Sequence, residues 1–137
     1  MAIVLPQGRF INSSDKHIRE FIAERCRILA VVGLHGNVFK PHTGTKTSVM
    51  FVQKWDDKLC PKKDDYPIFF ATMQKPSKDK SGEKIYVKNP DTGKNLLDSH
   101  GHLIVDHDLY NHDGMTHDGI PEAFAEFAKK ESLSFFQ

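Results

Sequence analysis

The sequence predicts an α/β fold built around a mixed β-sheet. Two apolar, β-branched runs, residues 28–34 and 47–53, have the length and composition of strands. An apolar run at residues 2–5 precedes a segment with helical spacing, and this strand–helix–strand order is typical of a crossover between parallel strands. Because residues 47–53 follow residues 28–34 without an intervening helix, we expect them to pair antiparallel with a neighbour.

The first strand and the first helix are predicted from residues 2–26. Residues 2–5 form a continuous apolar run, which is typical of a strand that lies inside a sheet with a partner on each side. The polar residues 12–15 supply N-cap candidates for the helix that follows. Its predicted buried stripe consists of four apolar residues at helical spacing: Ile18, Phe21, Ile22 and Cys26.

The second half of the chain has weaker signals. Residues 68–73 predict a strand that starts after Pro67, and residues 85–87 predict a short strand that closes a β-hairpin with it. Residues 75–84 contain four lysines and are strongly polar, which favours a solvated, mobile loop over a phosphate-contacting tip.

A C-terminal helix is predicted to begin beside Pro121, which suits the first turn of a helix. Phe124 and Phe127 recur at helical spacing and are predicted core residues. Phe135 and Phe136 are unusually apolar for a chain end and predict a contact surface or a truncation.

Length and composition set limits on the class of protein. A chain of 137 residues with 39% apolar and 27% charged residues is predicted to be one domain, or a piece of one. We expect a sheet-and-helix part at residues 1–54 and a loop-rich extension at residues 55–137. No apolar run approaches the roughly 20 residues of a membrane span, and two cysteines without ligand-like spacing indicate a cytoplasmic protein.

The basic residues are unevenly placed along the chain. The formal net charge is only +1, yet no acidic residue occurs between Glu24 and Asp56. A local cationic face that could meet phosphate is therefore predicted there. Its basic residues are Arg25, Arg27, Lys40, Lys46 and Lys54.

Several short stretches together resemble one known family. They are residues 2–6 with Gly8, the Ile18-Arg19 pair, Val-Phe-Lys at 38–40, and Thr-Gly-Thr-Lys-Thr-Ser at 43–48. In combination they resemble the N6-adenine DNA methyltransferases, specifically the modification (M) subunit of type I restriction–modification systems. The resemblance continues through Trp55, residues 66–70 and the C-terminal helix. It implies the C-terminal part of the catalytic domain: a partial Rossmann-like methyltransferase sheet ending in antiparallel strands.

The resemblance also implies what this chain does not carry. Such enzymes hold S-adenosylmethionine with a Gly-rich loop and the target adenine with an Asn-Pro-Pro-aromatic tetrapeptide, both earlier in the chain. Residues 33–36 have too few glycines and no helix start for such a loop, and residues 89–91 lack the second proline and the aromatic. We therefore predict a fragment that is inactive alone, without catalytic or cofactor-binding residues of its own.

The connector between the two long strands holds the predicted site residues. By the resemblance, Phe39 stacks on the extruded target base; the alternative is that Phe39 only plugs the loop onto the sheet. Lys40, Lys46 and Thr47 are predicted to contact backbone phosphates, although a turn with a solvated lysine explains the same residues. The predicted partners are DNA and the specificity and restriction subunits. A homo-oligomer is also expected, because an unpaired strand at residues 2–5 would be a hydrophobic edge.

Two other functions remain open from the sequence. One is a stand-alone DNA-binding or protein-interaction module. The other is a metal-binding protein built on five histidines that alternate with aspartates, although no pair of these histidines has the spacing that puts two ligands on one helix face. The histidines are His100, His102, His107, His112 and His117.

Overall fold

The computed structural model describes residues 1–112 and 119–133. The chain forms two compact units. Unit 1 consists of residues 1–34, 46–72 and 127 onward, and unit 2 consists of residues 35–45 and 73–126. The sheet extends past residue 54, because a strand at residues 69–72 belongs to unit 1. That all of these residues form a piece of one larger domain stays a prediction.

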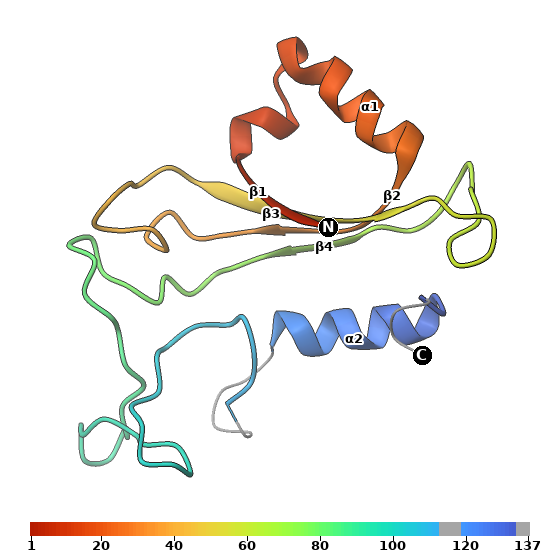
Figure 1. Cartoon of the computed structure of the whole chain (residues 1–137). Coiled ribbons are helices and arrows are strands. Elements are labelled where there is room, and N and C mark those ends of the chain that lie inside the picture. The colour runs from red at the N-terminus through yellow and green to blue at the C-terminus, as the bar shows by residue number, and fades with distance from the viewer. Residues whose placement is uncertain (113–118, 134–137) are drawn as a thin grey trace. The chain divides into compact units, whose positions relative to one another are not determined.

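Unit 1 contains a four-stranded mixed sheet (Figure 1). Its strands are β1 (Ala2–Pro6), β2 (Cys26–Gly33), β3 (Thr47–Lys54) and β4 (Phe69–Thr72), in the order β1-β3-β2-β4. β3 is antiparallel to both β1 and β2, whereas β4 is parallel to β2. The predicted α/β class with a mixed sheet is confirmed, and so is the antiparallel pairing of β3.

β1 has the edge position that was expected for residues 2–5 of this chain, although its apolar run is typical of an inner strand. Because β1 and β2 are each antiparallel to β3, they are parallel to each other, as the crossover required. β3 returns between them, however, so β1 lies at an edge of the described sheet rather than inside it. Its residues alternate between exposed and half-buried, and Val4 is 49% exposed.

The two faces of the sheet bear different layers. Across the strands Ile3, Met50, Val31 and Phe70 are aligned by register, so they share one face. Helix α1 (Lys16–Arg25) lies over this face (Figure 1). Phe69 precedes Phe70 in β4 and therefore points to the opposite face. Its ring centroid lies 5.6 Å from that of Phe127, which belongs to helix α2 (Ile120–Lys130). This helix confirms the predicted C-terminal helix.

Helix α1 is shorter and less covered than predicted. A 3-10 turn at Ser13–Asp15 precedes it, and the helix ends at Arg25, so Cys26 belongs to β2 and not to the helical stripe. Ile18 is 43% exposed and Phe21 is 56% exposed. The stripe is only partly covered because a helix of 10 residues spans only part of the sheet face.

Unit 2 is held together by short bridges rather than by a sheet. Tyr86 bridges Val105, and Leu97 bridges Leu103, around the buried Ile104. The predicted hairpin between residues 68–73 and 85–87 is therefore wrong. β4 pairs with β2, and the segment around Tyr86 finds its hydrogen-bonding partners within unit 2.

Two further sequence predictions concern membrane spans and the apolar C-terminal residues. In the described residues, no helix combines the length and the hydropathy needed to cross a membrane. Phe135 and Phe136, which were predicted to form a contact surface, lie outside the described residues.

Candidate nucleic-acid interface

The connector between β2 and β3 is a loop with hydrogen bonds of its own. His35 organises its first turn: the amide of Val38 donates to the His35 carbonyl oxygen (3.1 Å), and the amide of Asn37 donates to His35 Nδ1 (3.1 Å). The amide of Lys40 then donates to the carbonyl oxygen of Asn37 (3.1 Å). These bonds give the loop a defined backbone path, because its donors are used by its own acceptors.

Phe39 lies in the second turn of this loop, in unit 2. Its carbonyl oxygen accepts hydrogen bonds from the amides of His42 (3.0 Å) and Thr43 (3.2 Å). Its side chain is nevertheless 39% exposed, so part of it is accessible to solvent. An aromatic ring that reaches solvent from a hydrogen-bonded turn can serve as a stacking platform for a base.

The other two predicted site residues belong to unit 1. Lys46 is exposed, and its carbonyl oxygen accepts a hydrogen bond from the amide of Gln7 (3.0 Å). Thr47 opens β3, and its hydroxyl oxygen is buried without a hydrogen-bond partner among the described residues. The four predicted residues therefore form two pairs, Phe39 with Lys40 in unit 2 and Lys46 with Thr47 in unit 1.

The predicted cationic face is smaller than the sequence indicated. Arg27 is only 6% exposed, and its guanidinium lies over the Tyr66 ring, 5.2 Å from the centroid. The guanidinium of Arg25 lies over the Phe21 ring (3.9 Å to the centroid). Arg27 is thus buried against its aromatic neighbour, whereas Arg25 stays exposed beside Phe21 and still contributes its charge. Of the other three, Lys46 and Lys54 are exposed and Lys40 is half-buried.

Lys78, which was not among the predicted site residues, contacts the Phe39 loop. The side-chain amide of Asn37 donates to the carbonyl oxygen of Lys78 (2.9 Å), and the Lys78 ammonium donates to the carbonyl oxygen of Lys40 (3.0 Å). Residues 75–84 had been predicted to be a solvated loop. A lysine in a polar stretch carries no sequence signal that distinguishes a backbone contact from solvation, so this pairing could be found only in the structure.

The histidine cluster does not gather in one place. His100 and His102 are exposed and stack on each other, whereas His107 is buried and its Nε2 lies 3.2 Å from Nε2 of His112. His117 lies outside the described residues. Among those described, no three side chains of the metal-ligating types come together as a site for an ion.

The tautomer of His107 also disfavours a metal at this pair. The amide of Leu109 donates to His107 Nδ1 (3.2 Å), so a neutral His107 ring carries its proton on Nε2. That N–H points at His112 Nε2, where a metal would need a lone pair from each ring. The pair is therefore a hydrogen bond between two imidazoles.

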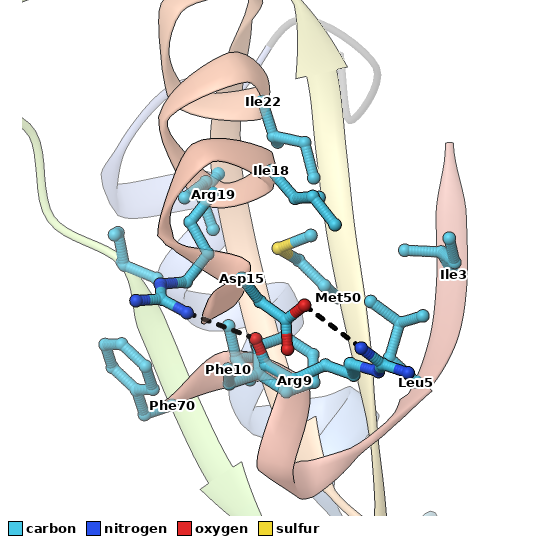
Figure 2. Close-up of a pocket in the computed structure, with 13 residues that line it drawn as sticks. Ile3, Leu5, Arg9, Phe10, Asp15, Ile18, Arg19, Ile22, Met50 and Phe70 are labelled. Atoms are coloured by element: carbon cyan, nitrogen blue, oxygen red, sulfur yellow. Dashed lines mark hydrogen bonds and ion pairs between the residues drawn. The ribbon is translucent and has the colours of Figure 1, made fainter. Parts of the chain in front are cut away.

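Unit 1 contains a cavity of about 300 Å³ between α1 and the sheet. Figure 2 shows Ile18 and Ile22 of α1 on one side of it, and Ile3 and Met50 of the sheet on the other. Nearly all of its lining is hydrocarbon, which is the character of a gap in packing between a short helix and a sheet.

An ion pair closes the polar end of this cavity. Arg9 Nη1 lies 3.0 Å from Asp15 Oδ1, and Arg19 Nη1 donates to the carbonyl oxygen of Arg9 (3.3 Å) (Figure 2). Arg19 Nη1 also donates to the carbonyl oxygen of Asn12 (2.7 Å). Asp15 is 5% exposed, and its Oδ2 atom is buried without a hydrogen-bond partner among the described residues. Since that oxygen has almost no accessible surface, the cavity does not offer it to a ligand. Both arginines have structural roles.

The residues after β2 do not fit a methyl-donor loop. Gly33 ends β2, the amide of Leu34 donates to the Thr47 carbonyl oxygen (2.9 Å), and the amides of Asn37 and Val38 donate to His35. A turn follows β2 where a cofactor loop would lead into a helix. Residues 33–38 therefore lack the loop-to-helix form that is typical of a dinucleotide or methyl-donor loop.

Comparisons with known proteins show the family of the chain. The family model described as N-6 DNA Methylase matches residues 1–129. Over 54 residues the chain is 37% identical to the type I restriction enzyme EcoEI methylase subunit of Escherichia coli. That match covers 39% of this chain and 11% of the relative, so the chain spans about a tenth of the relative's length.

Proposed function

The chain belongs to the N-6 DNA methylase family, and from this premise we propose that it supplies target-base and DNA-backbone contacts to an adenine-N6 DNA methyltransferase of the type I modification kind. The finer role is that of the C-terminal part of the catalytic domain, which is inactive by itself. Its proposed partners are DNA and the specificity and restriction subunits of such a complex. The family uses S-adenosylmethionine as methyl donor.

The observation that carries the proposal is the exposed Phe39 on a hydrogen-bonded turn. An enzyme that modifies a base inside a duplex must extrude that base and then hold it by stacking. The Phe39 ring is 39% exposed, and the two hydrogen bonds to its carbonyl oxygen fix the backbone that bears it. Stacking on such a ring contributes roughly 1–3 kcal/mol per base.

The proposed phosphate contacts are Lys40 in unit 2 and, in unit 1, Lys46 with Thr47, which follows it in the chain. Contacts of this kind position DNA without reading its sequence, which suits a chain whose recognition sequence is set elsewhere. Lys46 is exposed and can reach a phosphate directly. Thr47 can join it only by turning its buried hydroxyl away from the strand.

The methyl donor is proposed to bind outside this chain. The segment after β2 forms a turn and does not lead into a helix, and this supports the proposal that the donor pocket belongs to another segment of the complete enzyme. Calorimetry of this chain with S-adenosylmethionine is expected to give no binding heat. Saturable heat with a stoichiometry near one would contradict the proposal.

A fluorescence titration tests the base contact directly. The probe is a duplex with 2-aminopurine opposite a mismatched base, because a mismatched base costs least to extrude. Wild-type chain should increase the 2-aminopurine signal on binding, and Phe39→Ala should abolish the increase while DNA is still bound. Phe70→Ala is the matched control, since Phe70 is 70% exposed but lies on β4.

The backbone contacts are tested by salt dependence. The logarithm of the binding constant should fall linearly with the logarithm of salt concentration, and Lys46→Ala should reduce that slope by about one. A Phe39→Ala variant with an unchanged fluorescence increase, together with an unchanged slope for Lys46→Ala, would overturn the proposed function.

A further inference from the structure

The segment that follows β4 in unit 2 is a compact turn. Asp79 organises it: Oδ1 accepts hydrogen bonds from the Ser81 hydroxyl (2.6 Å), the Ser81 amide (2.9 Å) and the Glu83 amide (3.0 Å). These bonds, the Ser81 hydroxyl first, lower the pKa of Asp79. An antiparallel bridge between Lys78 and Lys84 closes the turn. Its position in unit 2 is therefore fixed locally.

The same segment is tied to the centre of unit 2. The amide of Ile85 donates to the Ser77 carbonyl oxygen (2.9 Å), and the amide of Asp106 donates to the Ile85 carbonyl oxygen (2.8 Å). The Lys75 ammonium lies 2.7 Å from Asp106 Oδ1. Residues 75–84 thus have a fixed base from which they can hold another loop.

Lys78 contacts the Phe39 turn on both sides of the aromatic residue. Its carbonyl oxygen accepts from the Asn37 side chain (2.9 Å), and its ammonium donates to the Lys40 carbonyl oxygen (3.0 Å). Both contacts are part-buried. A charged donor to a carbonyl is among the stronger hydrogen bonds in a protein.

Gly82 adds a second contact one residue further along the Phe39 loop. Its φ is +96°, and a Cβ atom at this position would lie 2.7 Å from the backbone nitrogen of Pro41. Only glycine allows the two backbones to approach so closely. Contacts from residues 78 and 82 therefore enclose residues 37–41, while the Phe39 ring remains exposed.

We propose that Lys78 is a positioning residue, which holds the Asn37–Lys40 turn so that the Phe39 ring is preorganised for an extruded base. The inference rests on the proposed function of Phe39. A ring fixed before binding pays less conformational entropy when it receives the base. Removing the Lys78 ammonium should therefore weaken base stacking more than it weakens binding to the DNA backbone.

The test compares Lys78→Met with Lys80→Met. Both variants remove one lysine charge from the same turn, but Lys80 is exposed and only Lys78 reaches the Phe39 loop. Hydrogen exchange is followed at the His42 and Thr43 amides, which bond to the Phe39 carbonyl oxygen. The Leu96 amide, which bonds to the Val87 carbonyl oxygen, reports whether unit 2 is still folded.

The expected results separate this inference from the proposed function. Lys78→Met should accelerate exchange at His42 and Thr43 by about tenfold or more, leave Leu96 protected, and lose most of the 2-aminopurine increase. Lys78→Arg should restore part of that increase, because a guanidinium can also donate to the Lys40 carbonyl oxygen. Lys80→Met should resemble wild type in both measurements.

Three outcomes would overturn the inference. In the first, Lys78→Met leaves the exchange and the fluorescence unchanged while Phe39→Ala abolishes the fluorescence increase; the proposed function then survives alone. In the second, exchange accelerates but the fluorescence increase is retained, which reduces Lys78 to a structural contact. In the third, Phe39→Ala itself has no effect on the fluorescence, and the proposed base contact of Phe39 fails together with the positioning role.

Discussion

The Nε2 atoms of His107 and His112 lie 3.2 Å apart in unit 2, and both rings contact the ring of Tyr110. Leu109 donates its amide hydrogen to His107 Nδ1. The arrangement therefore accommodates a neutral His107 that donates one proton to His112. Protonation of both rings would place two positive charges against each other.

Unit 2 should lose stability as the pH falls below about 6.5. Burial lowers the pKa of His107, and nearby His112 lowers it further, against the opposing influence of Asp106 and Asp108. The unfolded chain then binds a proton at His107 more readily than the folded chain does. The contribution of neutral His107 to stability is therefore complete above the pKa that His107 has in the unfolded chain. It is lost as the pH falls from that value through the lower pKa of His107 in the folded chain.

Urea unfolding between pH 8 and pH 5.5 measures this effect. His107→Gln should flatten the decline in the free energy of unfolding, whereas His17→Gln, an exposed substitution on α1, should not. A decline of equal steepness in His107→Gln would exclude the His107–His112 pair as its origin.

Gly82→Ala should destabilise the chain more than Gly93→Ala. Both glycines have positive φ, +96° and +69°, so each substitution incurs a backbone cost of about 1–2 kcal/mol. Only at Gly82 would the new Cβ meet Pro41, while the Cβ position at Gly93 is open. The comparison requires thermal unfolding of the two variants, and equal losses would contradict the close approach at Pro41.

Arg9→Met should destabilise unit 1 by roughly 1–3 kcal/mol, because it leaves the buried Asp15 carboxylate without its charged partner. Arg25→Met is the control. Arg25 pairs with the exposed Glu24 at 3.4 Å, and such surface pairs contribute within about 1 kcal/mol. Urea unfolding of both variants decides the matter, and a similar loss in each would refute the special role of the buried carboxylate.

The isolated chain should self-associate through β1. This edge strand pairs with β3 on one side only, so its other side is a template for a further strand. Val4→Lys places a charge on the edge strand and should shift the mass measured by light scattering toward the monomer. Leu97→Lys changes an equally exposed apolar residue of unit 2 and should have no such effect. A wild-type chain that stays monomeric at high concentration would refute this prediction.

The strands were predictable because their apolar, β-branched runs leave few alternatives. The predicted residues 47–53 became β3 at Thr47–Lys54, and residues 28–34 became β2, which starts earlier because Cys26 and Arg27 pair with the end of β3. The hairpin prediction failed because a run as short as residues 85–87 carries no information about its partner. The bridge to Val105 depends on how unit 2 folds.

The candidate site was predictable only in part. Phe39 was selected because it is an aromatic in a polar loop, and the resemblance gave it a role. The Lys78 contact was missed because it joins residues 38 positions apart through a backbone oxygen, which no local pattern encodes. Arg27 was misjudged for a related reason. The charge of Arg27 is visible in the sequence, but its burial against the Tyr66 ring is not.

The strand order determines when the strands can pair during synthesis on the ribosome. β3 lies between β1 and β2, although it is the last of the three to be synthesised. Until Thr47 and the rest of β3 are synthesised, β1 and β2 should therefore have no shared hydrogen-bond ladder, and their apolar side chains are not yet packed against β3. The eight residues of β3 then complete the central ladder of the sheet.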